Sequence, residues 1–191
     1  MCGNSTIGFT SENGISAVID LSLTAGNTPT LQVPVYFSQL DGSFNYNDSY
    51  KVSFDVQVSD RGKRATGAYE NVRVMFSIGT LGGKNCALLL QDNGVLCTSD
   101  ATGGWSTTLG TSGAKLGNTR AEYNEVQNVH LDFEFNKENR TFKIDISNSD
   151  GTNNTFTANI ADHMASTEDF VMNPHITFRT AKFEVSNFTF S

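Results

Sequence analysis

The clearest alternation of apolar and polar residues covers residues 129–147, VHLDFEFNKENRTFKIDIS. Apolar side chains occupy every second position of residues 129–135 and again of residues 142–146, with polar side chains between them. This period of two is typical of strands with one buried face and one solvent-facing face. If residues 137–140 form the loop of a hairpin, the two strands bring together three pairs: Phe135 with Phe142, Glu134 with Lys143, and Asp132 with Asp145. The two aspartates repel each other unless they lie in water or share a cation.

The same period recurs along most of the chain and predicts further strands. Pro34 places the strand of residues 31–37 at a sheet edge, because proline cannot donate a ladder hydrogen bond. The last strand changes phase between Val185 and Phe188, as a β-bulge would cause. One helical turn is expected over residues 161–167. The other strand-like runs are residues 15–22, 50–59, 72–78, 86–90, 95–98, 155–160, 175–180 and 182–190.

These elements define the fold class. Roughly a dozen short strands without a long helix predict an all-β sandwich. A chain of 191 residues fits one such domain, and we expect residues 1–191 to form it. With 38% hydrophobic residues and 14 phenylalanines, the chain can fill one core. No stretch reaches the ~20 apolar residues of a membrane span.

Composition and charge narrow the choice of partners. Only 17% of the residues are charged, the net charge is -7 and the sequence pI is near 4.8. Nucleic acid is a poor candidate partner, because a phosphate backbone requires clustered basic residues and the only such cluster is Arg61, Lys63 and Arg64. The low charge and the abundance of Asn, Ser, Thr and Gly suit an extracellular or cell-surface protein.

A disulfide between Cys86 and Cys97 is not expected. Cys86 and Cys97 flank a hairpin signal, and a two-residue Asn93-Gly94 turn would place Leu90 opposite Cys97. Cys86 would then lie roughly 13 Å from that position along its strand, beyond disulfide reach. The sequence therefore predicts two buried free thiols.

The N-terminal cysteine has another interpretation. Met1-Cys2-Gly3-Asn4 resembles an initiator methionine placed before the first residue of a mature lipoprotein, in which Cys2 would carry the anchor. An ordinary N-terminal cysteine is the alternative. No signal peptide is recognisable, so the chain is expected to be either cytosolic or a mature form whose signal has been removed.

Several stretches resemble a known family. YKVSFDVQVS, VRVMFSIG and CALLLQDNGVLC are similar to the middle strands of concanavalin-like and laminin-G-like jelly rolls, and NVHLDFEFNKENRTFKIDISNSDG is similar to their later hairpin. The closing VSNFTF resembles the last strand of secreted carbohydrate-binding jelly rolls. Where the family has a Trp-His pair, Val129 precedes His130 in this chain. The resemblance covers about residues 50–190 and implies a two-sheet sandwich with a curved face that commonly binds glycans.

One candidate site uses aromatic rings in loops. Trp105 is the only tryptophan, and a flat ring between glycines and small polar residues can stack on a sugar. A buried tryptophan is the alternative, and both interpretations stay open. Asp92 and Asn93 are also explained as turn residues. The residues proposed to bind carbohydrate are Trp105, Tyr69, Tyr123, Asp92, Asn93 and Asp100.

The alternative site lies on the polar face of the 129–136 strand. Concanavalin-like glycosidases carry carboxylates at alternate positions of a strand, as a retaining mechanism requires. In this chain the first of those positions holds His130, followed by Asp132 and Glu134. A solvated strand face with Glu134 paired to Lys143 is the simpler interpretation, which we favour. With Arg73, these three residues form the alternative concave-face set.

Other chemistry is weakly indicated. Asp132, Asp145 and the acidic loops supply oxygens for a structural Ca²⁺, yet no loop matches a known calcium spacing. No Ser-His-Asp set can be selected without arbitrary choice. The glycine-rich residues 101–117 lack the lysine and helix of a phosphate loop, so we interpret them as a surface loop.

The residues together favour a carbohydrate-binding module without catalytic activity, from a secreted or cell-surface protein. Its expected partner is a glycan or polysaccharide, and it is expected to be a monomeric domain, alone or within a larger protein. A polysaccharide-degrading glycosidase or lyase is one alternative. An adhesin or structural domain that binds protein is the other.

Overall fold

The structure is a computed structural model that describes most of the strands and a minority of the connections between them. The described residues are 15–20, 32–40, 49–61, 73–81, 84–91, 95–98, 107–111, 127–149, 151–159, 170–179 and 181–191. They form 12 strands and one short helix, α1 (Phe37–Leu40). Within this part of the chain, no helix is long and apolar enough to cross a membrane.

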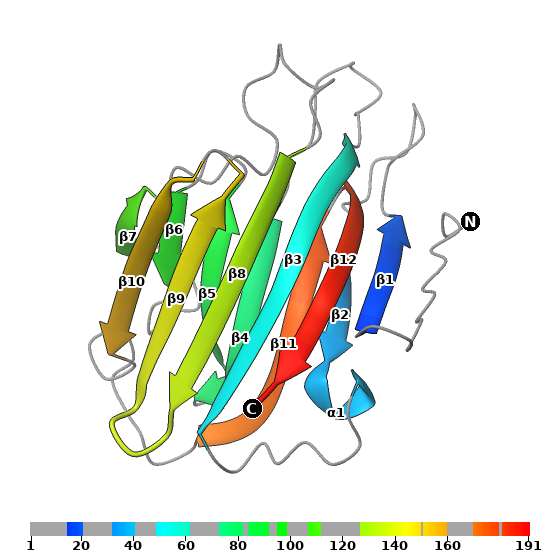
Figure 1. The fold of residues 1–191 in the computed structure, drawn as a ribbon. Coiled ribbons are helices and arrows are strands. Elements are labelled where there is room, and N and C mark those ends of the chain that lie inside the picture. Colours follow the sequence, from blue (N-terminus) through cyan, green and yellow to red (C-terminus); the bar gives the residue numbers. More distant parts are fainter. Residues whose placement is uncertain are drawn as a thin grey trace, which may run out of the picture.

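The strands form two antiparallel sheets that lie face to face (Figure 1). In the first sheet the strands follow the spatial order β1 (Ile15–Asp20), β12 (Ala181–Phe190), β3 (Tyr50–Arg61), β8 (Gln127–Asn136), β9 (Thr141–Asn148) and β10 (Asn153–Asn159). In the second sheet the order is β2 (Gln32–Tyr36), β11 (Phe170–Arg179), β4 (Arg73–Leu81), β5 (Lys84–Gln91), β6 (Val95–Thr98) and β7 (Thr107–Thr111). The predicted all-β sandwich is confirmed, and so is the edge position of the strand that contains Pro34.

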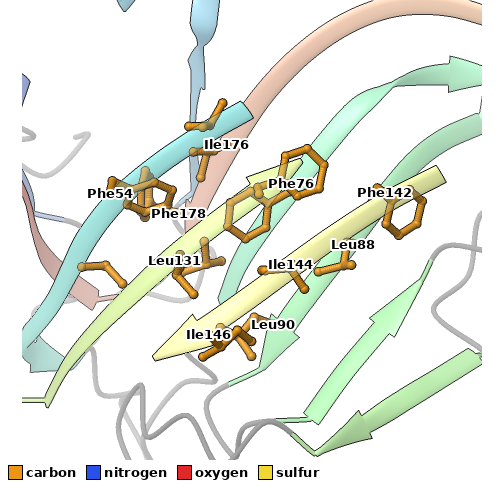
Figure 2. Packing of buried hydrophobic residues seen from close by; sticks show 14 of the residues in the cluster. Phe54, Phe76, Leu88, Leu90, Leu131, Phe142, Ile144, Ile146, Ile176 and Phe178 are labelled. Atoms are coloured by element: carbon orange, nitrogen blue, oxygen red, sulfur yellow. The ribbon is translucent and has the colours of Figure 1, made fainter. Parts of the chain in front are cut away.

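Inward-facing residues of both sheets build one hydrophobic core. Phe54 of β3, Phe133 of β8 and Phe76 of β4 are at most 1% exposed. The rings of Phe76 and Phe133 stack between the two sheets with centroids 5.0 Å apart, and Phe54 lies 5.9 Å from Phe76. Figure 2 shows Leu88 of the second sheet and Ile144 of the first in the same cluster. The alternation read from the sequence therefore identifies the buried face of each of these strands.

The central hairpin has the predicted register. Phe135 pairs with Phe142, Glu134 with Lys143, and Asp132 with Asp145, as expected. Residues 137–140 form the turn, in which Asn136 Oδ1 accepts a hydrogen bond from the Asn139 backbone N–H at 2.8 Å. Arg140 closes the turn in the left-handed region with φ 52°. The predicted bulge in the last strand is also present, because the β12–β3 register shifts between Ser186 and Thr189.

The predicted register of the β5–β6 hairpin is wrong by one residue. Leu90 pairs with Leu96, and Cys97 therefore pairs with Leu89. Leu96 joins the core cluster together with Cys86, whereas Cys97 lies on the other face of the sheet. Both cysteines are buried thiols that form no disulfide, as predicted. Burial raises the pKa of the Cys86 thiol to about 12.

Two boundaries differ from the sequence prediction. The glycine-rich residues 101–117 were expected to be a loop, but Thr107–Thr111 forms β7 and pairs with β6. An edge strand needs only backbone pairing on one side, so it carries little apolar alternation. β11 begins at Phe170 rather than at residue 175, and the register shift between Met172 and His175 accommodates Pro174. The helical turn expected over residues 161–167 lies outside the described residues.

Candidate functional site

The aromatic loop site remains a prediction. All six residues proposed to bind carbohydrate lie outside the part of the chain that the structure describes. Their flanking strands are described: Trp105 lies just before β7, and Tyr123 lies between β7 and β8. The candidate loops are thus attached to a strand of each sheet, since β7 belongs to the second sheet and β8 to the first.

The alternative set is divided between the two sheets. His130, Asp132 and Glu134 share the outer face of β8, because Leu131 and the other residues between them point into the core. Arg73 belongs to β4 of the second sheet, so it does not share a sheet with the other three. The structure thus brings three of the four residues together.

Each carboxylate on this outer face has a specific partner. Glu134 forms an ion pair with Lys51, which lies opposite it on β3, with Nζ 3.1 Å from Oε2. Lys143, the partner expected for Glu134, instead lies with its Nζ 2.5 Å from Asp145 Oδ2. The Thr155 hydroxyl also donates to Asp145. Lys51 and Lys143 both flank Glu134 in the sheet, so the register alone does not decide between them.

These contacts shift the pKa values of Asp145 and Lys143. Burial raises the pKa of Asp145, but hydrogen bonds from Lys143 and Thr155 outweigh this effect and hold the pKa below its ordinary value. The same hydrogen bond raises the pKa of Lys143. Asp145 and Asp132 face each other across β8 and β9; Asp145 is held by Lys143 and Thr155, and Asp132 lies 3.3 Å from His130 Nε2.

His130 is the centre of a network that joins three strands. Its Nδ1 lies 2.6 Å from Asp55 Oδ1, and its Nε2 lies 3.2 Å from Ser53 Oγ. The same Nε2 lies 3.3 Å from Asp132 Oδ2. Asn187 on β12 donates from Nδ2 to the second oxygen of Asp55 at 2.5 Å. The His130 side chain is 38% exposed, so small molecules can reach the network from solvent.

Sequence reasoning did not find this network. Ser53 and Asp55 occupy outward positions of β3, and His130 is 77 and 75 residues away along the chain. Pairing of β3 with β8 places Asp55 directly opposite His130. The alternation of residues in each strand shows which polar side chains face outward. Nothing in the sequence shows that β3 and β8 are neighbours.

The arrangement does not resemble a glycosidase pair. Such enzymes need one carboxyl group with a raised pKa as general acid. Glu134 forms an ion pair with Lys51, and Asp132 lies 3.3 Å from His130 Nε2, so neither carboxylate of this pair stands alone. Among the described residues, no group of three or more His, Cys, Asp or Glu could hold a metal ion. A structural Ca²⁺ in the acidic loops remains a prediction.

The outer face of the second sheet differs from that of the first. Ser77, Ala87 and Leu89 point away from the core cluster and are nevertheless at most 3% exposed. Among the described residues of this face, Met75 on β4 is half-buried, and so are Tyr36 and His175 toward the β2 edge, whose rings lie 5.0 Å apart. Burial lowers the pKa of His175, and a hydrogen bond to the Asn173 carbonyl opposes this shift. The first sheet thus presents a solvated polar face, and the second presents a largely covered one.

Comparison with known proteins identifies the architecture. No protein-family model matches the chain, and no curated protein does. Lectin UEA-II, complexed with galactose, is 10% identical with a TM-score of 0.53 over 98% of this chain and 95% of its own. Lectin II from Ulex europaeus has a TM-score of 0.52 at 10% identity, and the alignment covers 98% of this chain and 96% of that lectin. The winged bean acidic lectin, complexed with methyl-α-D-galactose, has a TM-score of 0.52 at 11% identity, and the alignment covers 98% of this chain and 89% of that lectin.

At this identity the likeness shows the fold. The chain has the jelly-roll sandwich of the legume lectins, which confirms the resemblance to concanavalin-like domains.

Proposed function

We propose that this chain is a lectin-like domain that binds carbohydrate and does not cleave it. The observation that carries the proposal is the fold: a two-sheet sandwich that aligns over 98% of the chain with lectins complexed with galactose or methyl-α-D-galactose. We further propose that the domain acts outside the cell, secreted or at the cell surface, as its low content of charged residues suggests.

The described core supports this proposal by supplying a rigid scaffold. Binding residues often lie on loops that a packed framework holds in place. Phe76 and Phe133 lock the two sheets together, and Trp105 is carried by the segment that enters β7. In the proposal its ring stacks on the apolar face of a sugar, and Tyr123 and Asp100 add polar contacts.

The paired carboxylates of the first sheet favour binding over cleavage. A glycosidase that used Asp132 and Glu134 would need one free acid and one free base. In the structure, Lys51 neutralises Glu134 and His130 contacts Asp132. We therefore place the sugar at the loops, away from these carboxylates.

A glycan panel with three proteins tests the proposal. The wild type should bind at least one immobilised glycan and release no reducing ends from it. Trp105→Ala should lose that binding by at least tenfold, which is about 1.4 kcal/mol. Glu134→Gln serves as the matched control and should bind as the wild type does.

The other outcomes select the alternatives. New reducing ends or unsaturated products that disappear in Glu134→Gln would establish a polysaccharide-degrading enzyme. Absence of binding to any glycan by the folded protein would contradict the lectin proposal and leave the protein-binding adhesin.

A further inference from the structure

Ser53, His130 and Asp55 are arranged as a nucleophile, a base and an orienting carboxylate. The histidine contacts the serine through Nε2 and the aspartate through Nδ1, at 3.2 Å and 2.6 Å. Both distances lie within the hydrogen-bond reach expected of such a set. A set of this kind is recognised by its geometry, whatever the order of its members along the chain. We propose that Ser53 is a base-activated nucleophile that accepts acyl groups from small uncharged esters.

The two ring nitrogens have separate tasks in this proposal. Asp55 accepts the proton on Nδ1, so that Nε2 of the neutral ring is the acceptor that faces Ser53 Oγ. Asn187 holds Asp55 by donating to its other oxygen. Asn187 itself adopts φ 55° at the bulge of β12, and this left-handed conformation brings it beside Asp55. Asp55 and Asn187 are therefore positioning residues.

The chemistry conserves atoms and charge at each step. Ser53 Oγ attacks the ester carbonyl carbon while its proton passes to His130 Nε2. The carbon–oxygen bond to the alcohol breaks, and the imidazolium returns its proton to the leaving alcohol, which leaves an acyl ester on Ser53. Water then attacks that ester, gives a proton to His130, and releases the acid as Ser53 regains its hydrogen.

Charge around Ser53 determines which esters fit. Asp132 lies opposite Ser53 on β8, and its carboxylate contacts the same Nε2. Its negative charge attracts the positive charge that the ring gains when Ser53 loses its proton. Together with Asp55 it also repels an anionic substrate, whereas the nearby cation Lys51 is bound to Glu134. The site should therefore favour uncharged esters over anionic ones.

The position on an open sheet sets the rate. Backbone amides of β3 pair with β8 and β12 on both sides, so the strand offers no free pair of amides to the developing oxyanion. Loss of one such donor slows an acyl transfer by about 10²–10³-fold. We therefore expect slow acylation that reactive esters reveal, with the modification confined to Ser53.

The test follows acylation of the full chain by p-nitrophenyl acetate. Peptide mass spectrometry should find an acetyl group on Ser53, and nitrophenolate release should accompany it. Ser53→Ala should abolish both signals at this site, and His130→Gln should slow them by about 10²–10⁴-fold. Ser147→Ala is the matched control, because Ser147 lies opposite His130 on β9 and should leave the rate unchanged. The anionic p-nitrophenyl succinate should react more slowly.

Asp55→Asn separates positioning from folding. It should lower the acetylation rate at least tenfold and shift the neutral His130 ring away from its Nδ1–H tautomer in ¹⁵N NMR, while the circular dichroism spectrum stays unchanged. Absence of acetyl-Ser53 in the folded wild type would overturn the proposal. Acetylation that persists at the same rate in folded His130→Gln would overturn it as well. Neither result bears on glycan binding, which the Ser53→Ala variant should retain.

Discussion

The stacked pair Phe76–Phe133 should be the strongest single link between the two sheets. Phe133 belongs to the first sheet and Phe76 to the second, and their rings lie 5.0 Å apart with an interplanar angle of 12°. Both side chains are at most 1% exposed. Replacing either one therefore removes contacts from both sheets at once.

The expected magnitude follows from burial and stacking. Phe133→Ala deletes a fully buried ring and should cost about 3–5 kcal/mol, a large share of the roughly 5–15 kcal/mol that stabilises a domain. Phe133→Leu keeps most of the volume and should cost about 1–2 kcal/mol, as the sum of a conservative core exchange and a lost aromatic contact. The coupling between Phe133→Leu and Phe76→Leu should be about 0.5–1.5 kcal/mol.

Urea unfolding followed by far-UV circular dichroism measures these values. The four proteins of the double-mutant cycle are compared at equal m-values, with Phe156→Leu as the control. Phe156 is only partly buried, on the edge strand β10, so its exchange should cost less than Phe133→Leu. A coupling below about 0.3 kcal/mol, or an equal cost at Phe156, would refute the claim that this contact joins the sheets.

Four smaller predictions test local features of the fold. Asp145→Asn should cost about 1 kcal/mol at neutral pH; because the folded pKa is lowered, urea titrations should show this difference vanishing as the pH falls through that pKa. His175, whose pKa burial lowers, should make the wild type lose stability below about pH 6.5, and melting curves of His175→Phe should lack that part of the slope. Cys86, with its pKa raised to about 12, should resist iodoacetamide in the native protein and react after unfolding, as peptide mapping would show; native alkylation would contradict its burial. Gly151→Ala should lower the unfolding free energy by about 1 kcal/mol, because Gly151 has φ +87° although no atom lies within 4 Å of an added Cβ.

The sequence predicts best where local pattern and loop length agree. Alternation on both sides of residues 137–140 leaves one register that buries Phe135 and Phe142 together, and the structure has it. The β5–β6 hairpin lacks this constraint. Residues 86–90 are buried on both faces of the strand, so no alternation fixes the phase, and the Asn93-Gly94 signal favoured a turn that gave the wrong register.

The candidate site depends on contacts that local patterns do not contain. The alternation of polar and apolar residues along the strand is enough to show that His130 and Glu134 face solvent together. Their partners come from β3, which is far away in the sequence and adjacent in the sheet. For that reason the Lys51–Glu134 ion pair and the Ser53–His130 contact became visible only in the structure.

Binding of a sugar at the loop that contains Trp105 is the central claim, and fluorescence of this single tryptophan tests it most directly. The protein is titrated with soluble polysaccharides and simple galactosides while reducing ends are assayed in the same samples. We expect a saturable change in emission with at least one glycan and no new reducing ends. Saturable binding that leaves the emission unchanged, or no binding to any glycan by the folded protein, would contradict it.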